Sequence, residues 1–87
     1  MKLIYTSRFQ KNMRLLSKSQ KVLVREQLFF FLKNRSDSSL RDHALSGNLS
    51  AYRSFSVDAD LRVLYRVVNP TCIKLMDIGP HSKVYKP

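Results

Sequence analysis

The sequence has few of the residues on which several common kinds of functional site depend. Its 87 residues include one cysteine, two glycines, three prolines, two histidines and no tryptophan. One cysteine excludes an internal disulfide, and the lack of closely spaced ligands argues against a zinc site. Two glycines are too few for a glycine-rich phosphate loop, and no serine has the setting of a nucleophile elbow. The sequence therefore predicts a protein without metal or cofactor.

Acidic residues and long apolar runs are also scarce. Six Asp and Glu oppose 16 Lys and Arg, so the formal net charge is +10. The apolar runs are far shorter than a bilayer requires, and the first ten residues do not resemble a signal peptide, so neither a membrane nor export is expected. Cys72 lies in an apolar run and is predicted to be a buried thiol, which fits the reducing cytoplasm. The basic surplus indicates a polyanionic partner, an acidic protein partner or an anionic membrane surface, and nucleic acid is the commonest of these.

The N-terminal half has the spacing of two helices, expected near residues 7–17 and 19–34. Ser7 with Gln10, and Ser17 with Gln20, both match a capping box at a helix start. Apolar residues then recur at helical spacing, and the outer faces are basic. The predicted apolar stripes are Phe9, Met13 and Leu16 in the first helix, and Val24, Leu28, Phe31 and Leu32 in the second.

The C-terminal half changes to an alternating pattern. "AYRSFSV", "LRVLYRVV" and "CIKLMDIG" are three strand-like runs joined by short turns, and "KLIY" at residues 2–5 is a candidate first strand. Three such runs predict an antiparallel meander. The segment between helices and strands is expected to be a loop with about one helical turn. The whole chain, residues 1–87, is predicted to be one α+β domain in which an N-terminal helical hairpin packs on an antiparallel β-sheet.

Basic and proton-transferring residues gather in this half. Arg62 and Arg66 should share a strand face because their spacing is even, and in a meander Arg53 could lie near them across one strand boundary. Such arginines can bind a phosphate in forked pairs, although a solvated basic face would look the same. Histidine transfers protons readily near neutral pH, and tyrosine can stack on a base; a surface tail and a loop histidine remain the alternatives. The candidates are Arg53, Arg62, Arg66, His81, Tyr85, His43, Asp60 and Lys83.

The order of these motifs resembles a known family. "DHALSGNLSAYRSFSVDADLRVLYRV" followed by "IKLMDIGPHSKVY" resembles the RelE superfamily of type II toxin–antitoxin toxins, in its YafQ and RelE/StbE branches. The resemblance implies a RelE-like, microbial-ribonuclease-type fold. It also implies an mRNA endonuclease that acts in the ribosomal A site without metal, where the 2′-hydroxyl of the substrate attacks the adjacent phosphate. Such chemistry needs a base, an acid and cations for the phosphate.

The resemblance also assigns roles residue by residue. Arg62 matches an arginine that acts on the phosphate, and Tyr85 matches a terminal aromatic that stacks or transfers a proton. Four further positions match family site residues or lie beside one: His81, His43, Asp60 and, next to a substrate-contacting lysine position, Arg53. Arg66 and Lys83 are expected to bind RNA. The chain departs from the YafQ pattern at Ser56, where a histidine is expected, and at Leu61, where a tryptophan is expected.

The implied partners are a cognate antitoxin, mRNA, and the ribosome with the 16S rRNA around its A site. Operator DNA would be bound only through the antitoxin. The departures at Ser56 and Leu61 leave open a catalytically silent protein that only binds an antitoxin. A ParE-like gyrase inhibitor is a further alternative, against which the His81 and Tyr85 ending argues.

Overall fold

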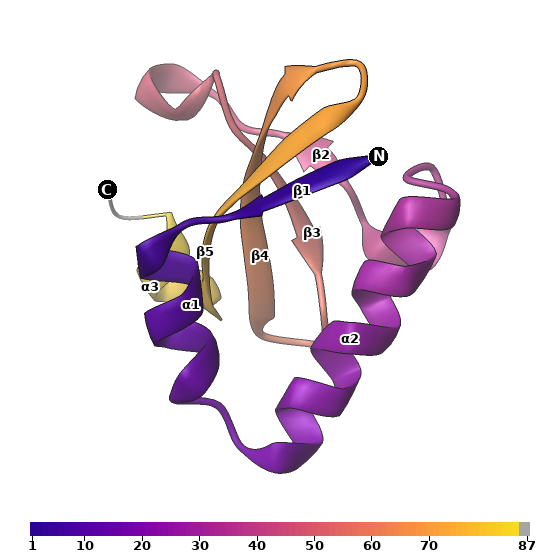
Figure 1. Cartoon of the computed structure of the whole chain (residues 1–87). Coiled ribbons are helices and arrows are strands. Elements are labelled where there is room, and N and C mark those ends of the chain that lie inside the picture. The colour runs from indigo at the N-terminus through magenta and orange to yellow at the C-terminus, as the bar shows by residue number, and fades with distance from the viewer. Residues whose placement is uncertain (86–87) are drawn as a thin grey trace.

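The computed structural model describes residues 1–85, in which α-helices lie on both faces of one β-sheet (Figure 1). Lys86 and Pro87, the end of the predicted domain, lie outside the described residues. Two 3₁₀ turns, Ser38–Leu40 and Gly47–Leu49, interrupt the long connection before the third strand. The elements are β1 (Lys2–Tyr5), α1 (Ser7–Arg14), α2 (Lys18–Lys33), β2 (His43–Ala44), β3 (Arg53–Ser56), β4 (Leu61–Asn69), β5 (Cys72–Pro80) and α3 (His81–Val84).

The sheet has the strand order β1-β5-β4-β3-β2. Strands β3, β4 and β5 form the predicted antiparallel meander, and the candidate strand at residues 2–5 is confirmed as β1. This strand pairs parallel to β5, from Lys2 opposite Cys72 to Tyr5 opposite Leu75, so the sheet is mixed. The alternating pattern could not indicate that direction, because a strand four residues long has the same pattern in both.

One of the two predicted helix starts is confirmed. Ser17 and Gln20 form a complete capping box at the start of α2. The box predicted at Ser7 is wrong, because Thr6 is the N-cap and its hydroxyl accepts the N–H of Phe9. Gln10 instead donates its side-chain amide to the Tyr5 carbonyl. The helix α1 also ends at Arg14, earlier than the predicted residue 17.

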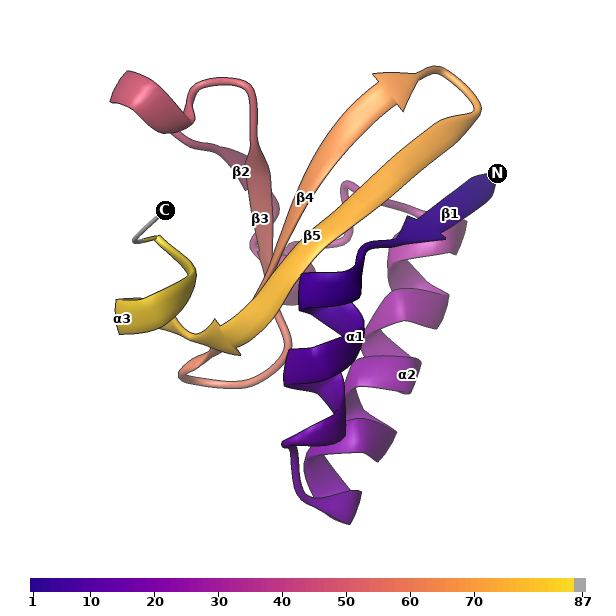
Figure 2. The same ribbon diagram turned by 60° about the vertical axis from the view of Figure 1, so that its left-hand side comes forward.

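The core lies between the sheet and the helical hairpin formed by α1 and α2. Phe31 of α2 stacks on Phe55 at 4.6 Å between ring centroids and meets Tyr65 edge-on at 4.9 Å. Cys72 is buried and free, as predicted. Leu32, which was predicted to face the core, is 45% exposed. The α+β class and the hairpin on the sheet are confirmed, while α3 covers part of the opposite face (Figure 2).

Candidate active site

The sheet face opposite the helical hairpin, here called the α3 face, carries most of the predicted site residues. Strand pairing fixes which side chains are neighbours on it, because directly paired residues point the same way. Ser54 pairs with Leu64, and Leu64 pairs with Asp77. In the adjacent row, Ser56 pairs with Arg62, and Arg62 pairs with Gly79.

The structure places His43, Tyr85 and His81 on this face, where Ser54 links the strand of His43 to Tyr85. His43 on β2 pairs directly with Ser54 on β3. The hydroxyl of the fully buried Ser54 lies 2.6 Å from that of Tyr85. The Tyr85 ring in turn meets the His81 ring edge-on, with 4.6 Å between centroids. The C-terminal segment is therefore attached to the sheet, and its histidine and tyrosine are fixed relative to β3.

The His43 ring has a defined orientation. Its Nδ1 lies 2.8 Å from the carbonyl oxygen of Arg41. A carbonyl only accepts hydrogen bonds, so Nδ1 is the donor and Nε2 carries the lone pair of the neutral ring. Arg41 has a φ of 49°, in the left-handed region, which turns its carbonyl toward the ring two residues on. Local backbone geometry thus leaves Nε2 as the proton acceptor.

A buried polar cluster holds the segment that carries His43. The Asp42 side chain is 6% exposed, and its carboxylate accepts Arg53 Nε at 3.0 Å. The Tyr65 hydroxyl donates to the other Asp42 oxygen and accepts from Arg53 Nε at 3.1 Å. Burial, aided by the bond to Asp42, raises the pKa of Tyr65 far above its ordinary value. The phenol therefore stays a hydrogen-bond donor.

The three strand arginines, Arg53, Arg62 and Arg66, do not all lie on the same face of the sheet. We expected Arg53 to lie near Arg62 and Arg66, but it shares a face with its partner Tyr65, which is the face toward the helical hairpin. Arg62 and Arg66 lie on the α3 face, as their even spacing predicted, and Arg66 is exposed. The expectation failed because strand positions of opposite parity point to opposite sides of a sheet.

Arg62 is held by the loop between β3 and β4. Its Nη1 donates to the carbonyls of Asp58 and Leu61, at 2.8 and 3.2 Å, and its Nη2 donates to that of Ala59 at 3.1 Å. Asp58 closes the same loop by accepting the N–H groups of Asp60 and Leu61. These two backbone bonds, with help from Arg62, lower the pKa of Asp58. A guanidinium has five N–H groups, so the three bonds to carbonyls leave donors for a phosphate.

The remaining candidates lie at the margins of this face. The carbonyl of Asp60 accepts the His81 N–H at 3.0 Å, so these two residues meet through the backbone. Lys83 is exposed on α3. Ser56 is buried beside Arg62, at the position where a histidine was expected. Leu61, at the expected tryptophan position, packs in the core.

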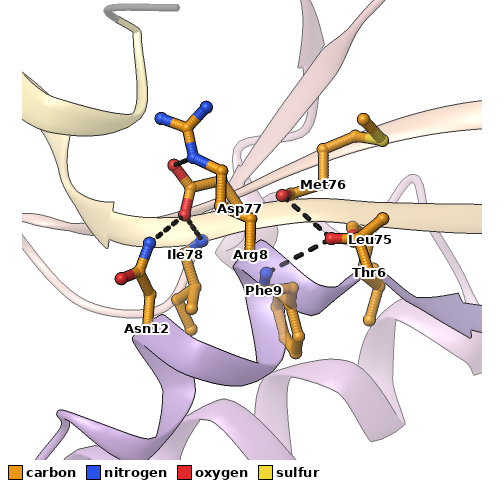
Figure 3. A network of polar contacts seen from close by, with 8 residues as sticks. All are labelled: Thr6, Arg8, Phe9, Asn12, Leu75, Met76, Asp77 and Ile78. Carbon is orange, nitrogen blue, oxygen red and sulfur yellow. Dashed lines mark hydrogen bonds and ion pairs between the residues drawn. The ribbon is translucent and has the colours of Figure 1, made fainter.

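A second buried carboxylate, which sequence reasoning did not single out, lies at the edge of the α3 face (Figure 3). Asp77 is 3% exposed and pairs with Arg8 Nε at 3.1 Å. It also accepts the Asn12 amide at 2.6 Å and the Ile78 N–H at 2.8 Å. A lone aspartate in a mostly apolar strand was the available signal, because a buried carboxylate requires partners.

Residues 1–85 contain neither a metal-binding cluster nor a membrane-spanning helix. No three His, Cys, Asp or Glu side chains of this part of the chain come together as a group that could hold a metal ion. No described helix has both the length and the apolar character needed to cross a membrane.

Comparison with solved structures shows the same fold in bacterial toxins. YafQ from E. coli strain BL21(DE3) matches with a TM-score of 0.81 and 17% identity, over 95% of this chain and 96% of that chain. A copper-bound mutant toxin from Helicobacter pylori matches with a TM-score of 0.75 and 26% identity, over 98% and 99%. YafQ in the E. coli DinJ–YafQ complex matches with a TM-score of 0.78 and 18% identity, over 95% and 94%.

The family is shown by the sequence itself. No curated protein matches the chain, but residues 1–86 match the profile of a family described as the bacterial toxin of type II toxin–antitoxin system, YafQ. The match covers nearly the whole chain, including the α3 face and the helical hairpin. The chain belongs to the YafQ family of bacterial toxins of type II toxin–antitoxin systems.

Proposed function

We propose that this toxin is an mRNA endonuclease that cuts on the ribosome without a metal ion. The observation that carries the proposal is that His43, Tyr85, His81 and Arg62 lie on one face of the sheet, in a protein with a net charge of +10. These residues supply proton transfer and a cation for phosphate, which are the groups that cleavage by an internal 2′-hydroxyl needs.

The geometry suggests a division of roles. Nε2 of His43 takes the proton of the attacking 2′-hydroxyl, since Nδ1 is bound to the Arg41 carbonyl. The new O2′–P bond forms as the P–O5′ bond breaks, which gives a 2′,3′-cyclic phosphate and a 5′-hydroxyl. His81 donates the proton to the leaving oxygen, and the remaining Arg62 donors bind the phosphate oxygens. Asp60 holds the backbone of His81, and Arg66 and Lys83 contact the RNA chain.

Induced expression with primer extension on cellular mRNA tests the proposal. Wild-type protein should arrest growth and produce cuts, whereas His43→Ala, His81→Ala and Arg62→Ala should reduce cutting by about 100-fold or more. Lys11→Ala, on the exposed side of α1, is the matched control and should behave as wild type. Full toxicity of all three variants would contradict the assigned site.

Two substitutions of Tyr85 distinguish a stacking role of its ring from proton transfer by its hydroxyl. Its hydroxyl is engaged by Ser54 and its ring contacts His81, so we expect the ring to matter more than the hydroxyl. Tyr85→Phe should keep most of the cleavage, and Tyr85→Ala should lose most of it. An equal loss of cleavage in both variants would instead show that the Tyr85 hydroxyl transfers a proton.

The second candidate function is that of a catalytically inactive protein that only binds an antitoxin, and the environment of Ser56 favours it. Its buried hydroxyl occupies the position of an expected histidine beside Arg62. Normal growth and intact mRNA after induction of the wild type would support a role limited to antitoxin binding. Introducing the expected side chain with Ser56→His would then be expected to raise cleavage.

We also propose a cognate antitoxin partner, as YafQ has in the DinJ–YafQ complex. Helix α2 leaves an apolar stripe exposed: Val22 is 49%, Phe29 56% and Phe30 45% exposed. Lys18, Arg25 and Lys33 flank this stripe and outnumber Glu26, which lies on it, so an acidic amphipathic segment fits it by charge and by apolar contact.

Co-purification with the product of the adjacent reading frame tests this surface. Phe30→Ser should weaken capture strongly, while Lys11→Ala on α1 should not. Undiminished capture by Phe30→Ser would place the antitoxin elsewhere.

A further inference from the structure

A cleft crosses the α3 face directly beside the His43–Tyr85–His81 group. Its volume is about 150 Å³. Leu64 in its floor pairs with Ser54, which binds Tyr85, and Val84 in its wall precedes Tyr85 in the chain. One end is polar and the rest is apolar or aromatic. The lining residues are Thr6, Arg8, Leu49, Tyr52, Leu64, Met76, Asp77 and Val84.

Arg8 presents hydrogen-bond donors at the polar end. Its Nε pairs with Asp77, and within residues 1–85 neither Nη group has a hydrogen-bond partner. In Figure 3 the Nη atoms point away from the Asp77 carboxylate. Asp77 itself is fixed by Asn12 and by the Ile78 N–H. A buried carboxylate therefore holds Arg8 through Nε, while the Arg8 side chain is 57% exposed and two of its nitrogens remain available.

The size and chemistry of the cleft select its occupant. A cavity of about 150 Å³ is large enough to hold benzene, so this cleft admits the six-membered ring of a nucleobase. Tyr52 and the aliphatic walls favour a flat, apolar-faced ring over a phosphate. Arginine only donates, so the base edge at Arg8 must offer acceptors. Guanine offers O6 and N7 side by side on one edge, and uracil offers O4, whereas the same edge carries the N6 donor in adenine and the N4 donor in cytosine.

We propose that this cleft is a base-reading pocket of the toxin, which receives a guanine or uracil next to the scissile phosphate and reads it through Arg8. The proposal rests on the proposed ribonuclease function and adds its sequence preference. Asp77 acts as a positioning residue because it pairs with the guanidinium, and Asn12 acts through Asp77.

Titration of methyl-labelled and ¹⁵N-labelled toxin with uncleavable 2′-O-methyl RNA trinucleotides tests it, with one base varied at a time. We expect shifts at the methyl groups of Leu49, Leu64 and Val84, and at least about fivefold tighter binding of guanine or uracil than of adenine. Arg8→Ala should weaken the preferred trinucleotide about tenfold and abolish the preference. Arg8→Lys should keep the charge but lose the preference, since lysine lacks the fork.

Arg14→Ala, on the same helix and outside the cleft, is the control and should leave binding unchanged. Shifts confined to His43, His81 and Tyr85 would overturn the pocket. So would equal weakening of all four bases by Arg8→Ala with full rescue by Arg8→Lys, which would make Arg8 a phosphate contact. Base-selective binding by a toxin that never cuts mRNA would support the pocket while overturning the ribonuclease function. Cutting of mRNA without any base preference would support the ribonuclease function while overturning the pocket.

Discussion

At the scale of single residues, two buried carboxylates organise the polar chemistry of this toxin. Asp42 and Asp77 are each paired with an arginine and receive further hydrogen bonds. A buried carboxylate that loses its partner is strongly destabilising. Both arginines are therefore first of all structural counter-charges, and any contact with RNA is made by the donors that remain.

Arg53 provides the sharpest test of this view. Arg53→Ala removes the counter-charge of Asp42, so it should lower the free energy of unfolding by about 2 kcal/mol, as measured by urea denaturation. Arg66→Ala, which is exposed on the other face, should change it by less than about 0.5 kcal/mol. If Arg53→Ala weakened RNA binding at unchanged stability, Arg53 would be an RNA contact, as the sequence suggested.

At the scale of elements, the junction between β1 and α1 depends on one hydroxyl. Thr6 Oγ1 accepts the Phe9 N–H and donates toward the carbonyls of Leu75 and Met76, at 2.8 and 3.1 Å. Thr6→Ala should therefore lower the free energy of unfolding by about 1–2 kcal/mol. Ser7→Ala, at the cap that the sequence predicted, is the control and should be nearly neutral in the same thermal or urea denaturation. A larger loss for Ser7→Ala would restore the predicted capping box.

The loop between β3 and β4 should make stability depend on pH. Because folding lowers the pKa of Asp58, its ionised form contributes stability that is fully present above the ordinary value of about 3.9 and is lost as the pH falls through the folded pKa. The wild type should therefore exceed Asp58→Asn in unfolding free energy at pH 5–7, and the difference should shrink below about pH 4. A difference that stays constant down to acidic pH would refute this role of the charge.

Elements were more predictable from the sequence than contacts. Periodicity indicated the helices and the meander because both patterns are local. The Thr6 cap was missed because its carbonyl partners are about 70 residues away in the chain, and Asp42, Arg53 and Tyr65 meet only after the strands pair. The pairing of His43 with Ser54 uses a strand of two residues, which is too short for alternation to reveal.

At the scale of the whole molecule, charge should govern binding to RNA. The protein has a net charge of +10, and two of its six acidic residues, Asp42 and Asp77, are already paired with arginines. The log of the Kd for a 2′-O-methyl RNA should rise linearly with the log of the salt concentration. If Lys83 contacts one phosphate, Lys83→Ala should reduce the slope of this line by about 0.7. Fluorescence anisotropy at several salt concentrations measures both. Binding that is independent of salt would contradict an electrostatic interface.

The position of β5 in the sheet has a consequence for synthesis. β5 lies between β1 and β4 in the sheet, yet it follows both of them in the chain. Until residues 72–80 are available, β1 and α1 lack their pairing partner, and α3 with its histidine and tyrosine does not yet exist. Such long-range pairing delays folding until residues 72–80 have been made. A chain that stops before residue 72 therefore has neither the complete sheet nor the proposed site, and a frameshift before residue 72 should remove both together.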